Sequence, residues 1–238
     1  MLVLALESAT SRPSLALLND QKLLSYRECD SSGSLTPQII PAIHELLGGA
    51  SVKVADLEGL AVSIGPGTFT GLRVGLATMT AFRFALGIPL VGVSTLEGLA
   101  WNLPNTVELP ILSTVAIRPD MVYWGLFRWR EMHLLSMQTD QMGKLSDVCA
   151  GLSEPTLVLG DGWIRNQACS GVNSGLLVEG PPEALWPSAV GVGRAGLVLL
   201  KGNNWLPEGC TPRYIQPSYA EASSQAVGGR RGSVKEQP

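Results

Sequence analysis

The sequence predicts an α/β protein built from two lobes, and three observations lead to this fold class. Up to Pro104, short apolar runs alternate with two long helical patterns, as in a sheet that is covered by helices. After Pro104 the pattern changes to a series of strand-like runs followed by one more helical pattern. The chain has 238 residues, a length that suits one large domain or two small ones.

The first lobe is expected to begin with three strands joined by tight turns. Residues 2–6 and 15–18 are short apolar runs, and the turn-forming pair Asn19-Asp20 precedes a third run at 22–29. Two further strands are expected later in this lobe, at residues 60–64 and 90–93.

Two longer patterns predict helices in the first lobe. In residues 35–47 the apolar side chains recur at spacings of three and four, and Ser34 is a candidate N-cap. Pro41 lies inside this pattern, where it is expected to remove one hydrogen bond and bend the helix slightly. The second helix is expected over residues 69–86, with Thr68 as its N-cap.

A capping-box pattern at residues 94–97 predicts a shorter helix that runs toward Trp101. In the second lobe, strands are expected at 111–117, 122–129, 132–137 and 157–159, with a turn at 160–162 and a helix over 188–201. The expected organisation is a first lobe over residues 1–104, a second lobe over 105–220 and a disordered tail over 221–238.

Charged side chains are scarce, and the deficit is concentrated in one segment. They make up 16% of the chain, against roughly 25% in typical soluble domains. Between residues 59 and 96 the only charged side chains are Arg73 and Arg83. No run there reaches the roughly 18–20 consecutive apolar residues of a membrane-spanning helix. Because Glu7 follows the start without a basic leader, we expect a cytoplasmic protein with no membrane partner.

The segment Gly65-Pro-Gly-Thr-Phe-Thr-Gly-Leu-Arg-Val-Gly75 is the most distinctive candidate for a site. A glycine-rich loop that leads into a helix N-terminus can bind an anion. However, the spacing matches neither a P-loop nor a dinucleotide fingerprint, so a tight structural turn is the alternative. Glu7 and Thr10, at the end of the first strand, could line a nucleotide cleft, but residues 7–10 contain no glycine for close approach to phosphate.

The helix at 69–86 is apolar on almost all sides, which predicts that two of its faces are buried. Gly71, Gly75, Thr78, Phe82 and Ala85 share one face, where small residues allow another helix to approach closely. The pattern leaves two interpretations open, an internal core or a docking surface for another subunit. His44 and His133 are the only histidines and lie far apart, so we expect no metal site and no catalytic residue.

Three stretches resemble the TsaB family, the non-catalytic dimerisation subunit of the bacterial tRNA threonylcarbamoyladenosine machinery, once grouped with glycoproteases. They are the glycine segment 65–75, Gly87-Ile-Pro-Leu-Val-Gly-Val-Ser-Thr-Leu-Glu97, and Leu4-Ala-Leu-Glu-Ser-Ala-Thr10. The match is specific over residues 1–101. It is weaker beyond, where Gly160-Asp161-Gly162 and residues 212–219 support it.

The resemblance implies a two-lobed fold of the actin-like ATPase (ribonuclease H-like) superfamily with mixed sheets. It implies binding to the catalytic subunit TsaD, together with the ATPase TsaE, for transfer of a threonylcarbamoyl group to the adenosine beside the anticodon. It further implies a homodimer when the chain is alone, contact with tRNA only through the complex, and no cofactor beyond ATP or another adenine nucleotide at a subunit interface.

The resemblance also assigns roles to residues. The partner-binding residues it implies are Leu35, Ile39, Ile43, Gly71, Val74, Gly75, Thr78 and Phe82. The signature-loop or nucleotide-contact residues it implies are Glu7, Thr10, Gly65, Gly67, Thr68, Thr70 and Arg73.

Three residues depart from the family pattern and weaken the case for a nucleotide site. Glu7 stands where the family often has Asp, Leu35 stands where it usually has His, and Ala116 begins a run where it has Asp-Ala-Arg. The alternative function is an independent nucleotide hydrolase or kinase of the actin-like superfamily that uses Glu7, Thr10 and residues 65–68.

Overall fold

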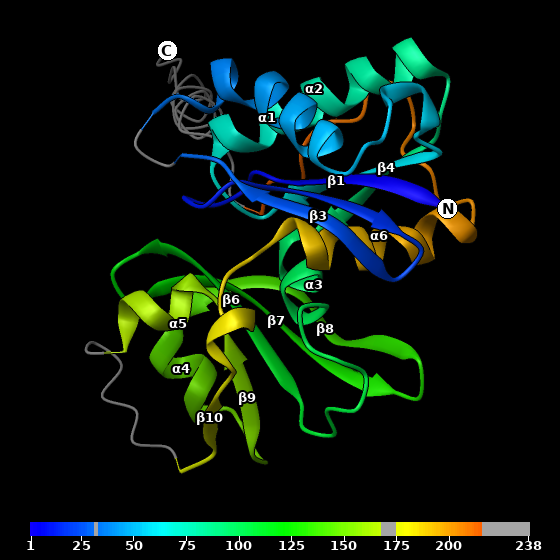
Figure 1. The fold of residues 1–238 in the computed structure, drawn as a ribbon. Coiled ribbons are helices and arrows are strands. Elements are labelled where there is room, and N and C mark those ends of the chain that lie inside the picture. Colours follow the sequence, from blue (N-terminus) through cyan, green and yellow to red (C-terminus); the bar gives the residue numbers. More distant parts are fainter. Residues whose placement is uncertain (31–32, 168–174, 216–238) are drawn as a thin grey trace, which may run out of the picture.

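The computed structural model describes residues 1–30, 33–167 and 175–215, arranged as two lobes around two mixed sheets (Figure 1). The expected tail at 221–238 lies outside the described residues. The first sheet has the order β3-β2-β1-β4-β5. Its strands are β1 (Leu2–Glu7), β2 (Ser14–Asn19), β3 (Lys22–Glu28), β4 (Gly59–Gly65) and β5 (Leu90–Ser94).

The second sheet repeats the plan of the first. Its order is β8-β7-β6-β9-β10, with strands β6 (Ile111–Arg118), β7 (Met121–Arg130), β8 (His133–Lys144), β9 (Thr156–Leu159) and β10 (Leu177–Glu179). In both sheets the first three strands in chain order form antiparallel pairs with their neighbours. The fourth strand then pairs in parallel with the first, and the fifth pairs in parallel with the fourth. The sequence shows no fixed-period repeat, so this duplication is visible only in the topology.

The helices form layers on both sides of the first sheet (Figure 1). Helices α1 (Leu35–Gly49) and α2 (Phe69–Leu86) cover one face, and α6 (Ala189–Lys201) covers the other. Helix α3 (Thr95–Ala100) packs against both α6 and the second sheet, so these two helices lie between the lobes. Two short helices, α4 (Leu145–Ala150) and α5 (Asp161–Asn166), belong to the second lobe. The short 3-10 turns are η1 (Val54–Asp56) and η2 (Pro182–Ala184).

The lobe boundary differs from the expected one because the chain returns to the first lobe. Helix α6 packs on β1, β2, β4 and β5, where the bare backbone of its glycines Gly193 and Gly196 lies against Leu18 and Ala61. Beyond α6, the Leu206 amide donates to the Leu90 carbonyl. The part of the chain from residue 189 to 215 was therefore wrongly assigned to the second lobe.

The helices at 35–47, 69–86 and 188–201 are confirmed, and Ser94 caps α3 by accepting from the amides of Leu96 and Glu97. Ser34 and Thr68 hold N-cap positions, but their side chains make no capping hydrogen bond. The expected turn at 160–162 is wrong, because α5 begins at Asp161. Among the described residues, no helix is long and apolar enough to cross a membrane.

Candidate functional site

The side of α1 and α2 that faces away from the first sheet is exposed and almost uncharged. Phe84 is 65% exposed and Ile40 is 52% exposed. We call this surface the docking face, and it consists of Pro37, Ile40, Pro41 and His44 of α1 and Arg73, Ala77, Ala81 and Phe84 of α2. Exposed aromatic and aliphatic side chains on a nearly neutral surface are typical of a protein interface.

The two arginines of the charge-poor segment hold the end of the described chain against α2. Arg73 donates from Nε to the Tyr214 hydroxyl at 3.1 Å, and its guanidinium lies 3.8 Å from the centre of the Phe69 ring. Arg83 donates from Nη1 to the Leu206 carbonyl at 2.7 Å. A groove of about 760 Å³ runs between α2 and residues 210–214. Arg73 and Arg83 are the only charged side chains of α2, and both make their contacts beside this groove. The rest of the α2 surface is therefore neutral.

Three of the residues implied as partner-binding are buried inside the chain, so that assignment is corrected. Ile39 and Ile43 are each 2% exposed, because they pack in the core between α1 and the first sheet. Gly75 is also buried, against Ser8. The other implied residues, Leu35, Gly71, Val74, Thr78 and Phe82, are partly exposed. The exposed side chains of the two helices lie one or more positions along from these residues.

The glycine signature serves close packing within the chain. A β-carbon on Gly71 or Gly75 would overlap atoms of Ser8, and one on Gly67 would overlap the Ala9 backbone. The Thr68 amide donates to the Ala9 carbonyl at 2.7 Å. The small residues thus allow the residues after β1 to pack closely on α2. The sequence had suggested that a second helix would pack there.

Glu7 lies at the end of β1 and is fully buried. Its Oε1 accepts from the Ala9 amide at 2.6 Å, while none of the described residues forms a hydrogen bond with its Oε2. Burial raises the pKa of Glu7 to about 7, because desolvation disfavours the carboxylate. Glu7 therefore holds a proton on a substantial fraction of molecules near neutral pH.

The second lobe places another buried acid, Asp161, where its charge helps to raise the pKa of Glu7. Asp161, at the start of α5, accepts from the Ala116 amide at 3.0 Å and pairs with Arg165 at 3.2 Å. Burial raises the pKa of this carboxyl as well. Arg165 also donates to the Ser11 hydroxyl at 2.8 Å, which joins the two lobes. In the sequence, Asp161 stands out only as part of Gly160-Asp161-Gly162, which resembles the family, and no local pattern indicates Arg165 or Ser11.

The structure separates the residues implied as nucleotide contacts. Glu7 and Thr10 are buried near the loop that carries Gly67, whereas Thr70 and Arg73 are exposed on α2. Gly65, at φ 113°, packs against the Arg213 backbone, and Thr68 is exposed at the N-cap of α2. In the described part of the chain, no group of three or more His, Cys, Asp or Glu side chains is placed to hold a metal ion.

Comparison with known proteins places the chain in a tRNA-modification family. The sequence model of the family described as "TsaD: tRNA N6-adenosine threonylcarbamoyltransferase" matches residues 31–159. The chain is 30% identical to the tRNA threonylcarbamoyladenosine biosynthesis protein TsaB of Bacillus subtilis, over 67% of this chain and 71% of the relative. It is 29% identical to the protein of that name from Escherichia coli, over 79% of this chain and 83% of the relative.

Solved structures support the two-lobed actin-like fold. YeaZ from Pseudomonas aeruginosa aligns with a TM-score of 0.74 at 23% identity, covering 90% of this chain and 99% of that one. Component A of the Acidaminococcus fermentans (R)-2-hydroxyglutaryl-CoA dehydratase aligns at 10% identity with a TM-score of 0.51, over 84% of this chain and 99% of that one. At these identities the likeness concerns the fold alone.

Proposed function

Because the chain belongs to the TsaB family, we propose that it is a non-catalytic accessory subunit in tRNA threonylcarbamoyladenosine biosynthesis. In this role it binds the catalytic subunit TsaD and works with the ATPase TsaE. TsaD transfers the threonylcarbamoyl group from threonylcarbamoyl-adenylate to the adenosine beside the anticodon, and the chain meets tRNA only through the complex.

The observation that carries this proposal is the docking face. Its α2 stripe of Ala77, Ala81 and Phe84 is exposed, uncharged and built on a long helix fixed to the first sheet. Such a surface is stabilised when a partner covers it, because the apolar side chains then leave water. In the absence of TsaD, a second copy of the chain would cover the same face. An adenine nucleotide such as ATP would be shared at a subunit interface, and the chain would need no cofactor of its own.

The packing after β1 supports an accessory role over independent nucleotide hydrolysis. The backbone of Ser8 and Ala9 lies so close to Gly71 and Gly67 that a β-carbon on either glycine would overlap it. The first loop therefore packs on the chain's own atoms, where a nucleotide hydrolase of this fold would need room for phosphate.

Reconstitution tests the proposal. Purified TsaD, tRNA and threonylcarbamoyl-adenylate are incubated with and without this chain, and the modified adenosine is measured by mass spectrometry. We expect modification to increase strongly when the chain is present and to be absent when it replaces TsaD. Equal modification without the chain would contradict an accessory role. ATP turnover by the chain alone, abolished by Glu7→Ala, would establish the independent hydrolase instead.

A further inference from the structure

A separate pocket of about 390 Å³ lies on the opposite side of the first sheet from the docking face. It is formed by the edge strand β3, the beginning of α6 and the loop at 182–188. Its apolar walls come from Leu23, Tyr26, Pro182, Trp186, Pro187 and Val190. This volume is sufficient for a small organic molecule.

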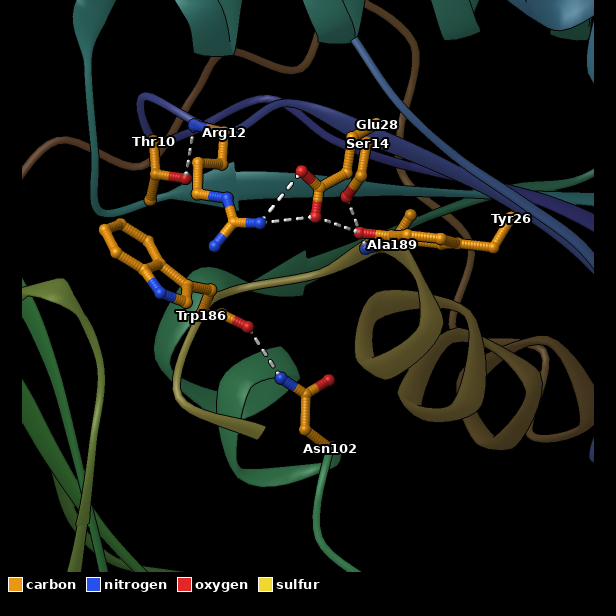
Figure 2. Close-up of polar contacts among 8 residues, drawn as sticks. All are labelled: Thr10, Arg12, Ser14, Tyr26, Glu28, Asn102, Trp186 and Ala189. Atoms are coloured by element: carbon orange, nitrogen blue, oxygen red, sulfur yellow. Dashed lines mark hydrogen bonds and ion pairs between the residues drawn. The ribbon is translucent and has the colours of Figure 1, made fainter. Parts of the chain in front are cut away.

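The wall that carries Trp186 is fixed by hydrogen bonds from Asn102, which follows α3. The Asn102 side-chain amide donates to the carbonyls of Ala184 at 3.3 Å and Trp186 at 2.8 Å (Figure 2). Its Oδ1 accepts from the Ser188 hydroxyl at 2.8 Å. On the other side of the loop, the Ala189 amide donates to the Ser14 hydroxyl at 3.0 Å. The pocket is therefore preformed, and a ligand would not have to order this loop.

Two of the four charged side chains that line the pocket neutralise each other. Arg12 donates from Nη2 to both carboxylate oxygens of Glu28, at 2.8 and 2.9 Å (Figure 2). The Tyr26 hydroxyl donates to the same carboxylate at 3.1 Å. The Arg12 guanidinium also lies 4.9 Å from the centre of the Trp186 ring. These contacts make a polar rim with little net charge.

The other two charged side chains have opposite signs and no ionic partner in the part of the chain that the structure describes. Arg194 of α6 is partly buried and makes only a 3.4 Å hydrogen bond from Nη1 to the Trp101 carbonyl among the described residues. Glu183, on the facing loop, makes no hydrogen bond or ion pair within the described residues. One positive group without an ionic partner and one exposed negative group thus line the same pocket, whose lining is part polar and part apolar.

We propose that this pocket binds a zwitterionic small molecule with an apolar body, the chemistry of a free α-amino acid with a large side chain. The carboxylate pairs with Arg194, the ammonium group pairs with Glu183, and the side chain packs among Trp186 and the neighbouring prolines. A ligand with a single charge would leave one of the two protein charges unmatched. The site lies apart from the docking face, so the inference does not depend on the proposed function.

The test compares three probes that share the same phenylethyl group by isothermal titration calorimetry on the full chain. L-Phenylalanine carries both charges, 3-phenylpropionate carries only the carboxylate, and 2-phenylethylamine carries only the ammonium group. We expect L-phenylalanine to bind about tenfold more tightly than either analogue, because each charge-assisted contact contributes to binding.

Two variants assign the charges. Arg194→Gln should remove the advantage of L-phenylalanine over 2-phenylethylamine, and Glu183→Gln should remove its advantage over 3-phenylpropionate. Arg130→Gln and Glu131→Gln, exposed positions in the second lobe, are the matched controls and should change neither comparison. Thermal melting curves verify that every variant is folded.

The proposal is overturned if L-phenylalanine shows no binding at millimolar concentrations. Equal affinity for all three probes would overturn it too, because the free charges would then play no part. It also fails if the control variants weaken binding as much as Arg194→Gln and Glu183→Gln.

Discussion

Gly75 of α2 lies directly against Ser8 at the end of β1, so closely that a β-carbon on Gly75 would overlap the Ser8 hydroxyl oxygen. This contact sets the distance between α2 and the first sheet. Residues 7–10 contain no glycine, so Ser8 brings a side chain into this contact. The helix must therefore supply the glycine that makes room for it. The docking face depends on this contact indirectly, because α2 presents its outer side from that position.

Gly75→Ala should destabilise the protein by about 1–3 kcal/mol, because overpacking here forces β1 and α2 apart. The Ser8 hydroxyl is buried and has no hydrogen-bond partner in the part of the chain that the structure describes, so Ser8→Ala should restore much of that stability in the double variant. Gly48→Ala in α1 is the matched control. A β-carbon there meets nothing within 4 Å, so this change should stabilise by up to about 1 kcal/mol. Urea unfolding measures all four proteins, and equal stability of Gly75→Ala and wild type would contradict the packing account.

Glu7 should make the protein less stable as pH rises from about 4.5 to about 7. The pKa of Glu7 is raised from 4.5 to about 7 in the folded state, so the folded chain binds more protons than the unfolded chain in this window. The full effect is on the order of 3 kcal/mol above the window. Glu7→Gln cannot titrate and should flatten this part of the curve.

The quantity to measure is the difference between the wild-type and Glu7→Gln unfolding free energies as a function of pH. Burial also raises the pKa of Glu97, and its contribution cancels in this difference. Asp161, whose own pKa is raised by burial, also raises the pKa of Glu7 through its charge, so the difference includes the interaction between these two carboxyls. Glu131→Gln, at an exposed carboxylate, should leave the wild-type slope unchanged. Parallel curves for Glu7→Gln and wild type would show that Glu7 is not desolvated in solution.

Ser94 and Ser34 occupy the same helical position but should differ in their contribution to stability. Ser94 accepts from the amides of Leu96 and Glu97 and donates to Asp140 of the second lobe at 2.7 Å. Ser34 makes no capping hydrogen bond. Ser94→Ala should cost about 1–2 kcal/mol, and Ser34→Ala less than about 0.5 kcal/mol. Thermal unfolding of the two variants compares them, and the reverse order would refute the assignment of these caps.

Local patterns in the sequence were sufficient for most elements but not for their partners. The apolar spacing and Thr68 predicted α2 at the bounds it has, because helix periodicity and caps are local signals. The same reasoning assigned α6 to the second lobe, since periodicity identifies a buried face and not the sheet that buries it. The packing of α6 on β1 and β4 is a tertiary contact between distant parts of the chain, which no local pattern predicts.

For the candidate site, too, the sequence predicted local features but not the residues that they contact. The small residues of α2 correctly indicated a close approach, but their neighbour is Ser8 and not another helix. The pocket beside α6 escaped prediction altogether. Arg194 and Glu183 are separated by a loop and belong to no motif, and they line one pocket only because Asn102 fixes the intervening loop.

The affinity of TsaD for the Ala81→Arg variant, measured by calorimetry, tests the central claim most directly. Ala81 is exposed at the middle of the docking face, so the substitution places a long charged side chain in the interface without disturbing the core. Ala150→Arg, at an exposed alanine ending α4, is the matched control. We predict that Ala81→Arg weakens TsaD binding at least about tenfold, while Ala150→Arg binds like wild type. Wild-type affinity of the folded Ala81→Arg variant would contradict the docking of TsaD on this face.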